Sequence, residues 1–207
     1  MSSPLFDTLF RPTTVTSAPD AAVSAAPVRM RGTRTRAGNA MDRTRAALLA
    51  GAARTVEVNG TRITMAQVAA AAGVAKATLY NHFRTREAVL SALVADQVRA
   101  LVDQNVDKAL DRALIDAAAG LSEHPLCRAL ARLEPAALAG LARIEPASEG
   151  WRVAREGVEA LLGPSGRAGT DLVLRWLASF LTTPGDRRAI AQDVAVLVAA
   201  LPVRSAG

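Results

Sequence analysis

After residue 40, apolar residues recur at the spacing of an amphipathic helix. The residues at positions i, i+3, i+4 and i+7 are Ala46, Leu49, Ala50 and Ala53. This period places their side chains on one helical face. Asp42, just before the run, is a residue type that caps helix N-termini, and the Asn-Gly pair at 59–60 is a typical helix end. The pattern predicts a first helix that starts at about Asp42.

Two short helices and a longer one are predicted next. Thr64 is a favourable N-cap for "MAQVAAAA", and Gly73 suits the left-handed position that follows a helix. A third helix is predicted from about residue 74 to Phe83. The fourth starts after Thr85 and continues at least to Leu101, with Leu114 as the farthest end. Two short helices joined by a tight turn are typical of a helix-turn-helix.

Proline and glycine divide the second half of the chain into predicted helices. "RLEPA" at 132–136 recurs as "RIEPA" at 143–147, and each proline suits the first turn of a helix. "GPSGRAG" at 163–169 lacks the Gly-Lys-Ser/Thr ending of a phosphate loop, so we expect it to link two helices.

The last two predicted helices, "TDLVLRWLASFLTT" and "DRRAIAQDVAVLVAALP", are apolar beyond one stripe. Such helices need burial on two sides. One side can be the chain's own core and the other a second copy of the protein, which would form a four-helix bundle across a two-fold axis. The alternative is deep burial within a single chain. The predicted dimer-interface residues are Val173, Trp176, Leu177, Phe180, Ile190, Val194, Leu197, Val198 and Leu201.

Composition favours an all-α protein of the cytoplasm. Half of the 207 residues are apolar, with glycine and proline mostly outside the apolar runs. The longest uncharged stretch, residues 63–75, falls well short of the roughly 18 residues of a membrane span, and no secretory signal begins the chain. A single cysteine, Cys127, fits a reducing compartment.

The positive charge is concentrated at the N-terminal end. Residues 1–40 carry a net charge of +3, residues 41–90 carry +4 and residues 91–207 carry −1. A basic end on a near-neutral body points to a polyanionic partner, nucleic acid first and an anionic membrane surface second. Residues 1–40 have the composition of a disordered tail. The arginines near its end (Arg29, Arg31, Arg34 and Arg36) form either a solvated cluster or an arm that follows DNA phosphates.

The predicted third helix has one apolar and one polar face. Ala75, Leu79 and Phe83 fall at i, i+4 and i+8 and are expected to face inward. The polar set left for the outside is Lys76, Thr78, Tyr80, Asn81 and His82. The second helix of a helix-turn-helix offers such a face to the DNA major groove.

These outward residue types can bind DNA. Lys76 can donate to guanine, Asn81 can pair with adenine, and Thr78 can contact a thymine methyl group or a base edge. The expected phosphate contacts are Thr64, Tyr80, His82, Arg84 and Arg86.

The stretch "TMAQVAAAAGVAKATLYNHFRTREAVLSALV" resembles the DNA-binding region of the TetR family of bacterial transcriptional regulators. The resemblance covers about residues 42–95. It implies phosphate contacts at Thr64, Tyr80 and Arg86. Base-reading positions are implied at Lys76, Ala77, Thr78 and Asn81. Two residues depart from the family pattern: Ala75 stands where Ser is frequent, which removes a hydroxyl cap, and Arg86 replaces a usual Lys.

The resemblance also implies a fold and a mode of action. An N-terminal three-helix DNA-binding domain at 41–90 would precede a larger helical domain at 91–207 with a ligand pocket and a dimer interface. The protein would be a homodimeric repressor of a palindromic operator, released by a small-molecule effector. The many Ala, Leu and Val residues favour an apolar or amphipathic effector. Candidate ligand-binding residues are Cys127, Arg128 and Trp151, with ordinary packing as the alternative for Trp151.

Other functions remain open at this point. A helix-turn-helix activator and an effector-independent DNA-binding protein fit the same residues. A helical enzyme is disfavoured because the chain has two histidines and no nucleophile elbow, dinucleotide fingerprint or metal cluster. His124 and Cys127 are spaced to share a metal ion, but a structural site usually needs four ligands. No cofactor or metal is predicted.

Overall fold

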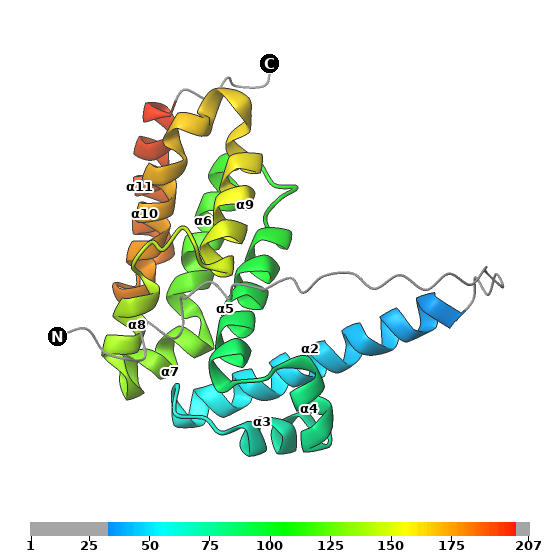
Figure 1. The fold of residues 1–207 in the computed structure, drawn as a ribbon. Coiled ribbons are helices and arrows are strands. Elements are labelled where there is room, and N and C mark those ends of the chain that lie inside the picture. Colours follow the sequence, from blue (N-terminus) through cyan, green and yellow to red (C-terminus); the bar gives the residue numbers. More distant parts are fainter. Residues whose placement is uncertain (1–32, 202–207) are drawn as a thin grey trace.

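Helices form every regular element in the computed structural model, which describes residues 33–201 (Figure 1). The elements are α2 (Thr33–Asn59), α3 (Met65–Ala72), α4 (Lys76–His82), α5 (Arg86–Asp103), α6 (Leu110–Glu123), α7 (Pro125–Leu133), α8 (Pro135–Leu141), α9 (Glu149–Gly166), the 3-10 turn Arg167–Gly169, α10 (Thr170–Thr182) and α11 (Arg187–Ala200). The predicted all-α class is confirmed. None of these helices has both the length and the hydropathy needed to cross a membrane.

The first helix is longer than its sequence pattern predicted. It begins at Thr33, so Asp42 lies inside it and does not cap it, and residues 33–40 are helical and not part of a tail. Ala37 and Ala40 are strong helix formers and no proline interrupts the segment, so the helix propagates toward the N-terminus. The N-terminal half of α2 projects away from the body (Figure 1). Residues 1–32, with Arg29 and Arg31, and the side chains of residues 33–39 lie outside what the structure describes.

The turn between α3 and α4 forms as predicted. The Thr64 hydroxyl accepts a hydrogen bond from the Gln67 backbone N–H, and the Gln67 side chain accepts one from the Thr64 N–H, so the N-terminus of α3 is capped on both sides. Gly73 ends α3 with φ 68° and ψ 28°, a left-handed conformation that glycine adopts without steric cost. Two short helices are thereby held at a fixed angle.

The ends of α4 and α5 follow from their capping residues. Ala75 precedes α4 without any side-chain cap, and it is exposed, which corrects the prediction that it faces inward. The Thr85 hydroxyl accepts from the Ala88 N–H and starts α5. α5 ends at Asp103, well before Leu114, because a turn at 104–109 separates it from α6.

Two other sequence predictions need correction. Pro135 begins α8 as expected, but Pro146 lies in an irregular turn, and α9 starts at Glu149 behind a Ser148 cap. The predicted linker at 163–169 is not an irregular loop: α9 continues to Gly166, and the 3-10 turn Arg167–Gly169 follows it. A kink at Gly163, with φ 65°, redirects the chain there toward α10.

Buried apolar residues form two clusters. The first joins α2, α3, α4 and the start of α5 to α7 and α8, through Leu126, Leu130 and Leu138. The second joins α6, α9, α10 and α11. The predicted domain boundary at residue 90 falls inside α5, next to residues that belong to the first cluster. Two helices from the second half of the chain therefore complete the core beneath the helix-turn-helix.

We expect Gly51→Ala to destabilise the protein. A Cβ atom at Gly51 would lie 2.7 Å from the Ala72 backbone nitrogen, so α3 would have to shift away from α2. Overpacking of this kind costs about 1–3 kcal/mol. Unfolding in denaturant measures the change in the free energy of unfolding.

The matched control is Gly120→Ala in α6, where the added Cβ meets only the flexible Leu101 side chain, at 3.3 Å. Because alanine favours helix over glycine, we expect this variant to be unchanged or stabilised by up to about 1 kcal/mol. Equal stabilities of the two variants would contradict the close α2–α3 contact.

Candidate functional site

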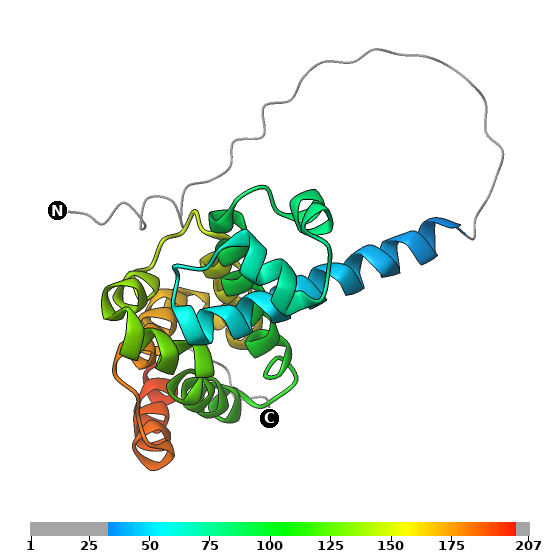
Figure 2. The same cartoon turned by 90° about the horizontal axis from the view of Figure 1, so that it is seen from below.

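One face of α4 presents a polar surface at the end of the molecule formed by α2, α3 and α4 (Figures 1 and 2). Its exposed residues are Lys76, Ala77, Tyr80 and Asn81, while Thr78 is half-buried. Leu79 and Phe83 lie on the opposite side of the helix, in the first hydrophobic cluster. Phe83 therefore anchors α4, and Tyr80 points its ring outward with 44% of the residue exposed.

Two arginines of α2 hold α3 and α4 in place. The Arg45 guanidinium carbon lies 4.9 Å from the centre of the Phe83 ring, close enough for a cation–π contact. Arg54 donates a hydrogen bond to the Ala71 carbonyl at the end of α3. The sequence pattern did not identify either contact, because Phe83 and Ala71 are remote from these arginines along the chain.

The residues predicted to contact phosphates differ in their solvent exposure and in whether another side chain already binds them. Thr64 and Arg84 are exposed, whereas His82 is half-buried with its ring 6.3 Å from that of Phe83. Arg86 is half-buried and binds Glu87 through two nitrogens, at 3.0 Å and 2.8 Å. Part of its guanidinium is thus already occupied, so Arg84 is the more available cation of the pair.

Glu87 is ionised at neutral pH. Burial acts to raise the pKa of its carboxyl group, but hydrogen bonds from its own backbone N–H and from Arg86 outweigh this and leave the pKa below its ordinary value. A lasting negative charge beside Arg86 orients the guanidinium and lowers the local positive charge. A phosphate at this place would have to share Arg86 with Glu87.

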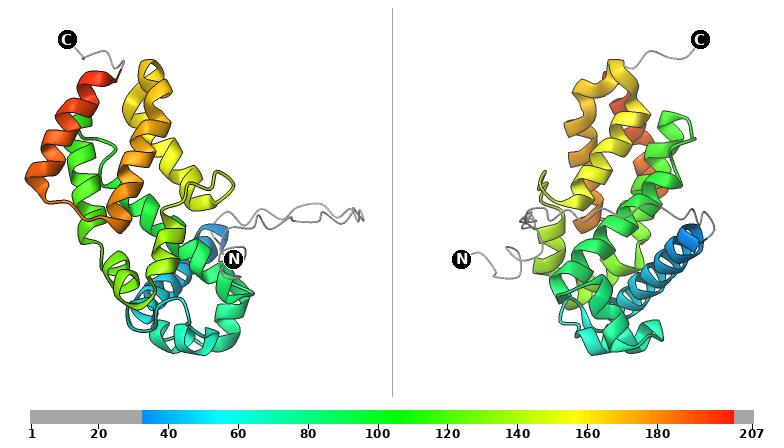
Figure 3. Two further views of the ribbon diagram at one scale, coloured as in Figure 1. Left: turned by 90° about the vertical axis from the view of Figure 1, so that its left-hand side faces the viewer. Right: turned by 45° about the vertical axis from the view of Figure 1, so that its right-hand side comes forward.

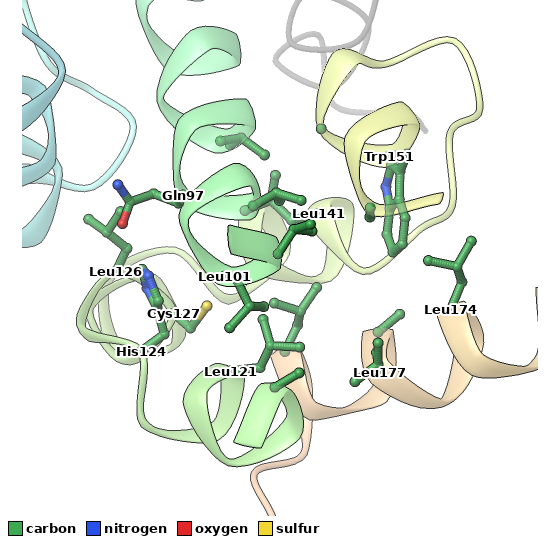
Figure 4. Close-up of a pocket in the computed structure, with 18 of the residues that line it drawn as sticks. Gln97, Leu101, Leu121, His124, Leu126, Cys127, Leu141, Trp151, Leu174 and Leu177 are labelled. Atoms are coloured by element: carbon green, nitrogen blue, oxygen red, sulfur yellow. The ribbon is translucent and has the colours of Figure 1, made fainter. Parts of the chain in front are cut away.

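A cavity of about 200 Å³ lies where the two hydrophobic clusters meet (Figure 4). Its walls come from the end of α2, from α5 and from α6 to α10, and nearly all of the lining side chains are apolar. Cys127 and Trp151 line it, as predicted for a ligand site, and so does His124. Arg128 is exposed and does not line it, which corrects that prediction: α7 turns Cys127 toward the cavity and the next residue toward solvent.

The titratable groups on the cavity wall are neutral at pH 7. Burial raises the pKa of the Cys127 thiol to about 11. Burial also lowers the pKa of His124, and the nearby carboxylate of Glu57 counteracts only part of this effect. The wall therefore offers hydrogen-bonding groups without a formal charge.

The residues predicted for a dimer interface lie mainly inside their own chain. Buried in the second cluster are Val173, Phe180, Ile190, Val194, Leu197 and Leu201. The other three, Trp176, Leu177 and Val198, are partly buried against the same cluster. α10 packs on α6 and α9, and α11 packs on α6, so the apolar stripes of both helices face inward. A partner would instead meet the outer faces of these helices, at the edge of the molecule seen in Figure 3.

Glu134, between α7 and α8, is tied to the turn between α2 and α3. Its carboxylate accepts hydrogen bonds from the Thr61 backbone N–H, at 3.2 Å, and from the Thr61 hydroxyl, at 2.5 Å. The Arg62 guanidinium lies 3.5 Å from it, and a Cβ atom at Gly60 would collide with it. Thr61 also lines the cavity. Sequence reasoning missed Glu134 because its partners lie 73 residues away; its place in "RLEPA" indicated only the start of a helix.

No metal site accompanies these features within residues 33–201: they contain no group of three or more His, Cys, Asp or Glu side chains placed to hold an ion. The arrangement has two parts, a polar helix face at one end and an apolar cavity next to it.

Comparison with known proteins gives a match for the part of the chain that contains the polar face of α4. The sequence model of the family described as bacterial regulatory proteins, tetR family, matches residues 48–93. No curated protein is similar enough to the chain to count as a match.

Two solved structures share the fold. The regulator of fatty acid degradation FadR from Bacillus halodurans is 19% identical, with a TM-score of 0.52 over 78% of this chain and 97% of its own. SCO7518 from Streptomyces coelicolor A3(2), described as a transcriptional regulator, is 21% identical, with a TM-score of 0.50 over 75% of this chain and 98% of its own. Both are described as regulators and neither as an enzyme.

We expect Glu134→Ala to lower the free energy of unfolding by about 1–3 kcal/mol, because the buried Thr61 hydroxyl and N–H lose their acceptor. Thermal unfolding should show a decrease in Tm of several degrees.

Glu145→Ala is the matched control for this substitution. Glu145 occupies the same position of "RIEPA" but contacts no part of the helix-turn-helix in any described hydrogen bond or ion pair. A loss of stability at Glu145→Ala as large as that at Glu134→Ala would show that the tie to the α2–α3 turn is not what Glu134 contributes.

Proposed function

This chain carries the DNA-binding region of the TetR family of bacterial transcriptional regulators, and on that premise we propose that it is a homodimeric repressor released by a small effector. The observation that carries the proposal is the pairing of an exposed polar face on α4 with an apolar cavity on the same core. In this proposal residues 41–90 bind DNA and residues 91–207 sense the effector and form the dimer.

The exposed face of α4 supports a division between base readers and phosphate anchors. Lys76, Thr78 and Asn81, with Ala77 beside them, lie along one stretch of the helix and have the chemistry to contact base edges. Tyr80 and Arg84 are exposed and can donate to phosphates. Thr64, Arg86 and His82 are secondary anchors, since the Thr64 hydroxyl is engaged in the cap of α3, Arg86 is engaged by Glu87 and His82 is half-buried.

Dimer formation is proposed through the outer faces of α10 and α11. These faces carry large exposed apolar side chains at Leu172, 52% exposed, and Val196, 72% exposed. Small exposed residues such as Ala195 and Ala199 on α11 would allow close approach of a second copy. A two-fold axis here would pair two α4 helices for successive major grooves, roughly 34–36 Å apart, which explains why a palindrome is the expected target.

Coupling between effector and DNA is proposed to run through α7 and α8. Leu130 and Leu141 of these helices line the cavity, and Glu134 between them holds the turn that leads into α3. An effector that moves α7 and α8 would move this turn, and α3 and α4 with it. Because the two α4 helices must match the groove spacing, a modest displacement would weaken operator binding.

Footprinting with the purified protein on selected DNA fragments tests the function. We expect protection of a palindrome whose half-sites are centred about one helical turn apart, with affinity that falls steeply as salt rises. Failure to protect any palindrome would overturn the regulator proposal, and a salt slope near zero would exclude DNA binding.

Two substitutions test the division of roles. Lys76→Ala should relax preference at one base pair of each half-site, a loss of discrimination of about 1–3 kcal/mol. Arg84→Ala should weaken binding to all sequences alike and reduce the salt slope by about one per DNA-bound protomer. Gel-shift titrations against the operator and its single-base variants distinguish these effects.

Arg152→Ala, at an exposed position of α9 outside α4 and outside the proposed dimer faces, is the charge-matched control and should leave the affinity for DNA unchanged. Identical behaviour of Lys76→Ala and Arg84→Ala across the operator variants would contradict the assignment of separate roles.

A further inference from the structure

We propose that the cavity binds an unbranched, uncharged aliphatic molecule that carries one small polar group, of the class of the medium- and long-chain alcohols. The assignment rests on the proposed effector role of the cavity and names the chemistry of its ligand. Three properties of the cavity support this ligand class: the absence of charged residues in its wall, its length relative to its volume, and the position of polar groups that are free to form hydrogen bonds.

The wall carries no fixed charge. Among the described residues that line the cavity there is no Asp, Glu, Lys or Arg. A carboxylate or an ammonium group inside it would lose its hydration without gaining a counter-charge, which is strongly unfavourable. This excludes fatty acids and alkyl amines as the preferred ligands, although their tails would fit the apolar wall.

The cavity is long for its volume. Residues of α5 from Leu90 to Val102 line it, and at 1.5 Å per residue these two positions lie roughly 18 Å apart along the helix. Its volume of about 200 Å³ is nevertheless below the roughly 300–1,000 Å³ typical of pockets for drug-sized molecules. A space of that length and volume is narrow, so it suits a single extended chain better than a compact ring system.

Polar groups with free hydrogen-bonding capacity lie on one side of this space. Figure 4 shows Gln97 and His124 on the side of Leu126, opposite Trp151 and Leu174. Gln97 donates to Asp96 at 3.3 Å through its amide nitrogen, which leaves its carbonyl oxygen as an acceptor. No described hydrogen bond engages the His124 ring, and a neutral imidazole offers one donor and one acceptor.

The other amide and hydroxyl side chains of the wall are already engaged. The Thr61 hydroxyl donates to Glu134. The Asn105 amide donates to the Leu101 carbonyl, at 2.7 Å, and accepts from the Lys108 ammonium group, at 3.0 Å. A hydroxyl group between Gln97 and His124 can donate to the Gln97 carbonyl oxygen and accept from the His124 ring N–H, while its alkyl chain follows α5.

Calorimetry with the full-length protein and a panel of ten-carbon ligands tests the class. We expect decanol to bind, and decanoate, decylamine and adamantanol to bind at least tenfold more weakly, the first two because of their charge and the last because of its shape. Across hexanol, octanol and decanol, affinity should rise roughly fourfold for each added methylene, the increment expected for burial of a CH₂ group. Equal or tighter binding of decanoate or of adamantanol would overturn the proposal.

Two variants test the position of the polar group. Gln97→Met and His124→Phe keep apolar volume but remove the hydrogen-bonding atoms, so each should reduce the advantage of decanol over decane severalfold. Trp151→Phe is the control, because it removes the indole N–H on the opposite side and keeps an aromatic wall. Loss of the preference in Trp151→Phe alone would contradict the assignment to Gln97 and His124.

A measurement on the unaltered protein avoids dependence on how the variants fold. Cys127 is the only cysteine of the chain, and its sulfur points into the cavity (Figure 4). Saturating decanol should therefore slow maleimide labelling of Cys127 at least fivefold, and unchanged labelling would contradict occupancy of this cavity.

A gel shift with the operator, run with and without decanol, distinguishes the two proposals. If decanol binds and protects Cys127 but does not release DNA, the ligand class stands and the effector mechanism fails. If none of the alcohols binds while the operator is still bound and protected, the ligand class fails and the DNA-binding function stands.

Discussion

The burial of Leu79 and Phe83 is the contact on which the DNA-binding surface depends. α4 has seven residues and no side-chain cap, and an isolated helix of that length is not stable in water. Its position is therefore determined by the two side chains that it places in the first hydrophobic cluster, and by Arg45, which covers the Phe83 ring. Because these buried side chains prevent α4 from rotating about its axis, its polar face stays exposed.

The same cluster links the two halves of the chain. Leu126, Leu130 and Leu138 come from α7 and α8, yet they complete the core beneath the helix-turn-helix. The cavity shares these helices, so the cavity and the polar face of α4 border one continuous set of packed side chains. Glu134 adds a polar contact, because its carboxylate accepts hydrogen bonds from a buried threonine. This shared packing is the physical basis for the proposed coupling.

Local features of the fold were predicted well, and features that depend on distant residues were not. The caps at Thr64, Gly73 and Thr85 each depend on atoms within about four residues, and each forms as predicted. The start of α2 was misplaced because Asp42 has the chemistry of a cap without terminating the helix. Pro146 was assigned to a helix because the sequence around it repeats that of Pro135, but only Pro135 is followed at once by helical backbone.

By itself, the sequence determined the helical periods, the turn at Gly73 and the residue types on the outer face of α4, because these depend on neighbours along the chain. It also determined the match of residues 48–93 to the model of the tetR family of bacterial regulatory proteins. Only the tertiary structure decided that the stripes of α10 and α11 face their own core, that Cys127 lines the cavity and Arg128 does not, and that Glu134 binds Thr61. The periodicity of a helix shows that one face must be buried, but what covers that face is set by segments that are remote in sequence.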